Sequence, residues 1–300
     1  MDCYIQNINR ILGKDIKTYE LSFLSNYSIS RYWEDMKAAK SFQTPYIYNS
    51  RLINIDDIQQ LYSNLEYKKF DNFENFYNFI FMNHQKYDIS VRLDMFYLNI
   101  KHKSHMGAHF ITIDSVTENK IIFFDTFLKK TELSKNVFQQ SVEDKKAKMS
   151  FDYIVVWTRK EEKQHLLINK ILIEKNIRKR IDLLEKIQSD FEEAKAVNLI
   201  DNRIVSLCIK HSLVAMGIAD FYHANGRLEN VLFIRKYFSF IKSIPFLKVV
   251  LKYRRLNKKY VQKLKNKKIE MSDWHNFIEE YMIIIFYEIT CYRNLIGQKL

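Results

Sequence analysis

A histidine and an aspartate stand at the two ends of a predicted β-hairpin. Residues 107–114 and 121–125 have the β-branched and aromatic composition of strands, and residues 115–120 have the polar composition of a turn. The ends of such a hairpin lie side by side, so we expect His109 and Asp125 to be neighbours. An imidazole oriented by a carboxylate is the base of a nucleophilic triad, which needs a thiol or hydroxyl to complete it.

Cys3 is the expected nucleophile. Apolar residues follow it at helical spacing, so residues 3–12 are predicted to form an amphipathic helix with Asp2 as its N-cap. The first turn of a helix favours a thiolate through its unpaired N–H groups and its dipole, although the carboxylate of Asp2 opposes this in part. The alternative interpretation is structural: a buried Cys3, a packed His109 and an Asp125 that only starts a turn.

Other cysteines and histidines are interpreted as structural. His102 and His105 precede the hairpin, but no nearby carboxylate or thiol completes a set of metal ligands with them. Cys208 and Cys291 lie in apolar helical stretches, which favour core packing. The sequence therefore predicts that Cys3 is the only nucleophile and that the protein has no metal or cofactor of its own.

The composition predicts a folded chain and excludes several function classes. Apolar residues make up 47% and aromatic residues 15% of 300 residues, enough for one large domain or two ordinary ones. Five scattered glycines exclude a glycine-rich phosphate loop, and Gly-x-Ser-x-Gly is absent. With three cysteines, no signal-peptide pattern and no apolar run long enough to cross a bilayer, we expect a cytoplasmic protein without a membrane partner.

The secondary-structure pattern changes near Arg159. Strand patterns end there and helical patterns follow, so we predict an α+β fold with domains at 1–160 and 161–300, the second all-helical. Before this boundary, residues 15–55 are predicted to mix short strands and loops. Helices are expected at 55–62 and 72–83, strands at 87–100 and 151–158, and helix breaks at Asn225-Gly226 and Ser243-Ile244-Pro245.

The net charge of +13 is concentrated in one stretch, which we call the basic run. Residues 231–269 contain thirteen Lys and Arg residues and no Asp or Glu. Such a run favours an acidic partner, although a solvated helix face is the commoner explanation. Interleaved aromatic residues also suit single-stranded nucleic acid; they are Tyr237, Phe238, Phe240, Phe246, Tyr253 and Tyr260.

The order of these features resembles a papain-like cysteine enzyme. Within that group the chain resembles the bacteriocin-leader-peptidase-like branch and, inside it, the butirosin-biosynthesis H family of acyltransferases. It is also similar to papain-like amide synthases of closthioamide assembly. The resemblance implies a papain-like catalytic domain followed by an all-helical domain. The matching motifs are the Cys3 helix, Asp94-Met95-Phe96-Tyr97-Leu98, His109-Phe110-Ile111-Thr112-Ile113 and a strand that ends in Asp125.

The resemblance implies acyl transfer in specialised-metabolite, non-ribosomal-peptide-like biosynthesis. An acyl group would pass from a carrier-protein thioester to Cys3 and then to an amine, which gives an amide. His109 would be the base and Asp125 would orient it. The implied partners are an acyl- or peptidyl-carrier protein, which brings its own phosphopantetheine arm and could dock on the basic run, and an amine substrate. A homodimer is also compatible.

One departure from the papain-like pattern bears on the reaction. Papain-like proteases have an oxyanion-hole glutamine shortly before the cysteine, whereas only Met1 and Asp2 precede Cys3. The backbone N–H of Cys3 is then one expected donor, and a thioester needs less activation than a peptide. Amide synthesis is therefore preferred. A cysteine peptidase or thioesterase is one alternative, and a nucleic-acid-binding protein that uses the basic run is another; the latter leaves the three catalytic candidates without a role.

Overall fold

The structure, a computed structural model, shows two compact units. We call Asp2–Leu21 with Tyr46–Leu167 the sheet unit, and Met1, Ser22–Pro45 and Ile168–Leu300 the helical unit. Whether the boundary of independently folding domains lies at residue 160 stays a prediction. The described residues are 3–13, 17–24, 58–59, 61–62, 64–98, 108–125, 130–143, 153–160, 168–195, 206, 209 and 221–296.

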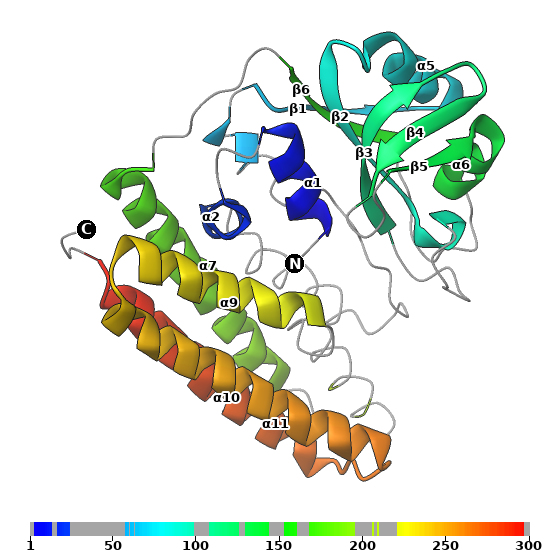
Figure 1. The fold of residues 1–300 in the computed structure, drawn as a ribbon. Helices are drawn as coiled ribbons and strands as arrows, with labels where there is room; N and C mark the ends of the chain where they lie inside the picture. Colours follow the sequence, from blue (N-terminus) through cyan, green and yellow to red (C-terminus); the bar gives the residue numbers. More distant parts are fainter. Residues whose placement is uncertain are drawn as a thin grey trace. The chain divides into compact units, whose positions relative to one another are not determined.

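The sheet unit is built on one antiparallel sheet with strand order β1-β6-β2-β3-β4-β5 (Figure 1). Together with the helices of both units, this sheet confirms the predicted α+β class. The predicted hairpin is β3 and β4, joined by a tight turn in which the N–H of Thr117 donates to the carbonyl of Lys120 at 2.9 Å. The strands are β1 Glu66–Phe70, β2 Tyr87–Asp94, β3 Ala108–Val116, β4 Lys120–Phe124, β5 Lys130–Ser134 and β6 Tyr153–Arg159.

Helices cover both faces of the sheet. Phenylalanines of α5 (Phe73–Asn83) and α6 (Lys135–Glu143) pack with Val91, Leu93 and Ile111 in one apolar core. The helix α1 (Cys3–Ile11) lies against the other face, where it contacts Thr112 and Phe124 (Figure 1). The hairpin is thus held between two layers of helix.

Two sequence expectations for this unit are corrected. The strand expected at 87–100 ends at Asp94, and Met95–Leu98 form a short 3₁₀ helix, η1. The reason is local, because the buried carboxylate of Asp94 accepts the N–H of Phe96 at 3.0 Å and turns the chain. Within 15–55, residues Thr18–Leu24 form a helix, α2, instead of a strand or loop, and residues 14–16 and 25–57 lie outside the described part.

The described part of the helical unit contains helices and the turns that join them, and no strand. Two predicted breaks are wrong: Gly226 lies inside α9, and Pro245 lies inside α10, which begins five residues earlier behind its N-cap Ser239. Proline disfavours a helix interior by about 3 kcal/mol, which burial of one face of α10 against its neighbours offsets. The helices are α7 Lys170–Lys195, α9 Phe221–Tyr237, α10 Phe240–Lys265 and α11 Ser272–Arg293.

A buried polar cluster joins these helices. The carboxylate of Glu288 on α11 accepts a bond from Arg227 at 3.4 Å and one from the Tyr253 hydroxyl at 2.8 Å. Burial disfavours the charge on Arg227, but the nearby Glu288 more than compensates and raises its pKa. Arg180, also buried, lies 4.0 Å from the centre of the Phe23 ring and donates to the Phe23 carbonyl at 2.6 Å.

We expect Glu288→Ala to destabilise the helical unit by about 3–5 kcal/mol, because it leaves the charge of Arg227 buried without its carboxylate. The measurement is urea unfolding followed by circular dichroism and tryptophan fluorescence. Glu185→Ala is the matched control, since Glu185 pairs with Arg293 at 2.6 Å in the same unit but both side chains are largely exposed. That control should change the unfolding free energy by less than about 1 kcal/mol. Equal effects of the two substitutions would contradict the role given to Glu288.

Candidate active site

His109 and Asp125 are in direct contact. Nε2 of His109 meets Oδ1 of Asp125, and both side chains are almost completely buried. The hairpin register explains the contact: Thr112 pairs with Phe124, so Asp125 continues β4 to a position diagonal to His109. The sheet therefore holds together two of the three residues that the sequence singled out.

The contact also indicates which ring nitrogen carries the proton of the neutral imidazole. In a hydrogen bond with a carboxylate, Nε2–H of the imidazole is the donor. The neutral ring then carries its proton on Nε2, and Nδ1 is its basic nitrogen. A nucleophile that transfers its proton to His109 must accordingly approach Nδ1.

Helix α1 is anchored to β3 by buried polar groups. The Nδ2 of Asn7 donates to the carbonyl of Phe110 at 2.8 Å, and the hydroxyl of Thr112 donates to Oδ1 of Asn7 at 2.7 Å. Near the C-terminal end of the helix, the Arg10 guanidinium lies 5.3 Å from the centre of the Phe124 ring. These contacts fix both the face that α1 turns to the sheet and its position along β3.

This anchoring places the backbone of Cys3 near the N-terminal end of β3, where His109 lies. Cys3 precedes Asn7 by one helical turn, so both residues lie on the face of α1 that is turned to β3. Four helix residues rise about 6 Å, which matches about two residues of a strand. Counting back from the contacts of Asn7 with Phe110 and Thr112 brings Cys3 level with His109. The side chain of Cys3 lies outside the described atoms.

The pleat of β3 adds a geometric condition. His109 pairs with Leu93, whose side chain belongs to the core under α5 and α6, whereas Thr112 contacts α1 on the opposite face. Because side chains alternate along a strand, the side chain of His109 leaves β3 on the face away from α1. His109 is the second residue of β3, so a group at the start of α1 would have to reach its ring around the start of the strand.

The positioning role of Asn7 was not predicted from the sequence. The sequence feature that could have indicated this role is a polar residue one turn after Cys3. It lies on the face of the helix that also buries Ile8 and Ile11. An amide is rarely buried without hydrogen-bonding partners, so this position could have suggested a fixed contact. Asp94 ends β2 beside Ala108, and its carboxylate accepts the N–H of Phe96.

If Cys3 is acylated as the sequence predicts, Asn7→Ala should lower the acylation rate while the protein stays folded. The substitution removes the hydrogen bonds of the Asn7 amide to Phe110 and Thr112, with a cost of about 1–3 kcal/mol in unfolding free energy. Gln6→Ala, on the same helix, is the control and should leave the rate unchanged. Rates from intact-protein mass spectrometry, with unfolding curves for both variants, test this. A normal rate in a destabilised Asn7→Ala protein would show that Asn7 acts on stability alone.

The other candidate residues do not form a second site in the described part. Cys291 is buried, and burial together with Glu288 raises the pKa of its thiol to about 11, which makes it a poor nucleophile at neutral pH. His102, His105 and Cys208 lie outside the described residues. The described residues contain no group of three or more His, Cys, Asp or Glu side chains that could hold a metal ion.

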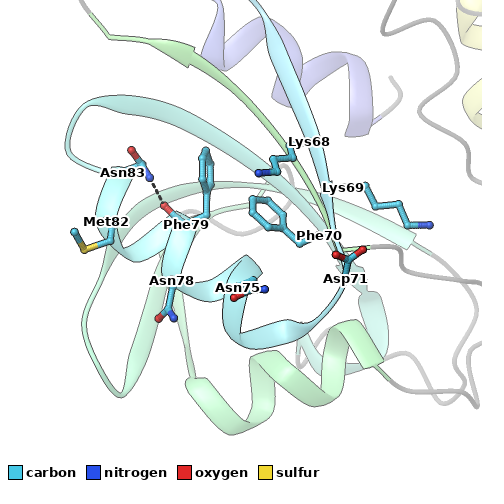
Figure 2. A pocket seen from close by; sticks show the side chains of 9 residues that line it. All are labelled: Lys68, Lys69, Phe70, Asp71, Asn75, Asn78, Phe79, Met82 and Asn83. Atoms are coloured by element: carbon cyan, nitrogen blue, oxygen red, sulfur yellow. Dashed lines mark hydrogen bonds between the residues drawn. The ribbon is translucent and has the colours of Figure 1, made fainter.

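A surface hollow in the sheet unit is separate from His109 and Asp125. Figure 2 shows it between the end of the edge strand β1 and the outer side of α5. Its volume is about 430 Å³. Its wall combines lysines and asparagine amides with two phenylalanine rings. The lining residues are Lys68, Lys69, Phe70, Asp71, Asn75, Asn78, Phe79, Met82 and Asn83.

The basic run lies mainly on α10. Its aromatic residues do not form one shared surface on which bases could stack. Phe246, Tyr253 and Tyr260 are buried in the helical unit and cannot receive nucleic-acid bases. Phe240 is exposed. This burial weakens the nucleic-acid interpretation, which depended on aromatic and basic side chains sharing one surface.

Comparison of the sequence with known protein families and with curated proteins found no match. Among the described residues, no helix combines the length and the apolar character needed to cross a membrane. The function is therefore argued from the chemistry of the site.

Proposed function

We propose that this protein is a papain-like cysteine acyltransferase that forms amide bonds. Cys3 is the nucleophile, His109 the general base and Asp125 the residue that orients the imidazole. The observation that carries the proposal is the buried contact between Nε2 of His109 and Asp125 at the start of β3. In the proposal, this contact orients the imidazole and Nδ1 is the nitrogen that accepts the proton of Cys3.

The first half-reaction transfers the acyl group to the enzyme. His109 takes the thiol proton of Cys3 through Nδ1, and the thiolate attacks the carbonyl carbon of a carrier-protein thioester. The backbone N–H of Cys3, at the start of α1, is one donor to the oxyanion. When the tetrahedral intermediate collapses, the carbon–sulfur bond to the carrier breaks, and the imidazolium returns the proton to the leaving thiol.

The second half-reaction forms the product. An amine attacks the Cys3 thioester, and His109 accepts a proton from the attacking nitrogen. The carbon–sulfur bond to Cys3 then breaks, the amide leaves, and the proton passes from His109 to the thiol of Cys3. Asp125 stays ionised throughout and holds the ring in one tautomer and orientation, as the acid of a triad does. No step uses a metal or a redox cofactor.

The donor in this proposal is an acyl- or peptidyl-carrier protein and the acceptor is an amine, in the cytoplasm. The phosphopantetheine arm belongs to the carrier. The support comes from the order Cys3, His109, Asp125 along the chain, from the antiparallel sheet between helices, and from the resemblance to papain-like acyltransferases. Hydrolysis of the same Cys3 thioester would make the protein a thioesterase, so the acceptor distinguishes the two activities.

The test is intact-protein mass spectrometry of the wild-type protein mixed with an acyl-loaded carrier or a small acyl thioester. The expected result is one added acyl group, mapped to Cys3 by peptide analysis, that disappears when an amine is added and reappears as an amide. A Cys291→Ser protein should behave identically. Loss of the adduct at the same rate with and without amine would favour the thioesterase. Absence of an adduct on Cys3 with any donor would refute the proposal.

A further inference from the structure

The outward side of α10 exposes large apolar side chains in one continuous stripe. Phe240, Ile244, Leu247 and Leu251 are 60%, 38%, 42% and 44% exposed, and Ile241 beside them is 74% exposed. Their spacing of four, three and four residues puts the first four on one face of the helix. The opposite face of α10 is buried, so this stripe does not belong to the core of the helical unit.

The same face changes character along the helix. After Leu251, the next positions on the stripe are Arg254, Arg255 and Lys258, all exposed. Lys248 lies within the apolar half and is exposed as well. The Arg235 guanidinium, from the end of α9, lies 5.2 Å from the centre of the Phe240 ring. Because residues 231–269 include no carboxylate, nothing in this stretch neutralises these cations along the chain.

The charge and shape of this face favour some binding partners over others. Three are compared: a second copy of the chain, a nucleic acid and an anionic membrane. A second copy of the chain would bring the same cations against them, which like-charge repulsion disfavours. Nucleic acid would satisfy the cations but not the aliphatic residues, since Ile241, Ile244 and Leu247 offer no ring for stacking. A bilayer with anionic lipids supplies phosphates for the cations and an apolar layer for a convex ridge, in any register along the helix.

We propose that the outward face of α10 binds the surface of an anionic membrane. The N-terminal half of the helix lies deeper, with its apolar stripe at the boundary between headgroups and acyl chains. Arg254, Arg255 and Lys258 contact lipid phosphates. Such a helix lies in the interface and does not cross the membrane, so the proposal agrees with the lack of a spanning helix among the described residues. It revises the sequence expectation of no membrane partner, which considered spanning segments only.

The test is sedimentation of the full-length protein with vesicles of phosphatidylcholine alone and with about one third phosphatidylglycerol. Wild-type protein should bind the anionic vesicles and bind the neutral ones at least roughly tenfold more weakly, with a loss of binding as salt rises. Two variants separate the two contributions. One replaces Ile241, Ile244, Leu247 and Leu251 by Gln, and the other replaces Lys248, Arg254, Arg255 and Lys258 by Gln.

Each variant has a matched control elsewhere on the surface. Ile171→Gln combined with Met82→Gln removes exposed apolar residues from α7 and α5, and glutamine at Lys68, Lys69, Lys175 and Arg178 removes four exposed cations. Both α10 variants should lose at least roughly tenfold in affinity for anionic vesicles, because each removes one of the two contributions. Both controls should bind as the wild-type protein does.

The proposal is overturned if wild-type protein does not sediment with anionic vesicles, or if the α10 variants and their controls bind equally. It is also overturned if the α10 substitutions leave vesicle binding intact but weaken binding of the acyl-loaded carrier or of single-stranded RNA. Weaker binding of the carrier or of the RNA would assign the face to a soluble acidic partner. Vesicle binding does not require Cys3, so a failure here and a failure of the acyltransferase proposal are distinguishable.

Discussion

Cys3→Ala should abolish the covalent acyl adduct and all turnover. The thiolate forms the bond in the first half-reaction, and the alanine methyl group cannot replace it. No other described cysteine is a substitute, since burial and Glu288 raise the pKa of Cys291 to about 11, so its thiolate is scarce at neutral pH. The measurement is intact mass after incubation with an acyl thioester, with single-turnover kinetics of thiol release.

Thiol labelling provides the matching positive result. A small alkylating reagent at low concentration should modify Cys3 first in the wild-type protein and leave Cys291 unmodified at neutral pH, because burial limits access to Cys291 and raises the pKa of its thiol. First modification at Cys291 or Cys208, or an acyl adduct that persists in Cys3→Ala, would contradict the assignment of Cys3.

The hairpin could be predicted from the sequence because its signals are local. β-branched and aromatic residues on either side of a polar turn determine β3 and β4, and antiparallel pairing then brings together their distal ends, where His109 and Asp125 stand. The nitrogen that meets the carboxylate could not be predicted. It depends on the side-chain rotamers of His109 and Asp125. The exact pairing was not predicted either, because a β-bulge between Ile113 and Ser115 inserts one residue into β3 and shifts the register.

The edges of the sheet were missed for a physical reason. The strand β1, Glu66–Phe70, has the sequence Glu-Tyr-Lys-Lys-Phe and is exposed except at Phe70, so it lacks the apolar alternation of a half-buried strand. Charged residues are common on edge strands, where they discourage pairing with other chains. β5, Lys130–Ser134, is the other edge and is similarly polar. A search for alternating apolar and polar residues finds strands that bury one face. It overlooks polar strands at the edges of a sheet.

In the helical unit, helices continue through residues that locally disfavour a helix. Gly226 and Pro245 predict breaks because each disfavours helix in isolation. Yet α10 runs through Pro245 with Phe246, Val249 and Tyr253 buried along one face. The aromatic residues of the basic run could not be placed on two different sides from the sequence, because the break predicted at Pro245 separated Phe240 from Phe246. On one continuous helix their spacing of six residues puts them on different sides, and Phe240 is exposed while Phe246 is buried.

His109→Ala and Asp125→Asn should have unequal effects. Loss of the general base removes the proton acceptor from both half-reactions, so His109→Ala should lower the rate by about 10² to 10⁴. Asp125→Asn keeps an oxygen that can accept Nε2–H, so the ring keeps its orientation and Nδ1 stays the basic nitrogen. The cost should then be smaller, because a cysteine–histidine pair can ionise without a fixed negative charge beside it. Asp125→Ala should fall between the two, since it removes the acceptor and leaves a buried imidazole N–H.

The measurement is the single-turnover rate of Cys3 acylation, followed by the rate of transfer to an amine, for all three variants. Circular dichroism and melting temperature serve as controls for folding, because both side chains are buried. Retention of the wild-type rate by a folded His109→Ala protein would remove the triad. A larger loss in Asp125→Asn than in His109→Ala would instead show that the negative charge of the carboxylate is needed, in addition to its role as a hydrogen-bond acceptor.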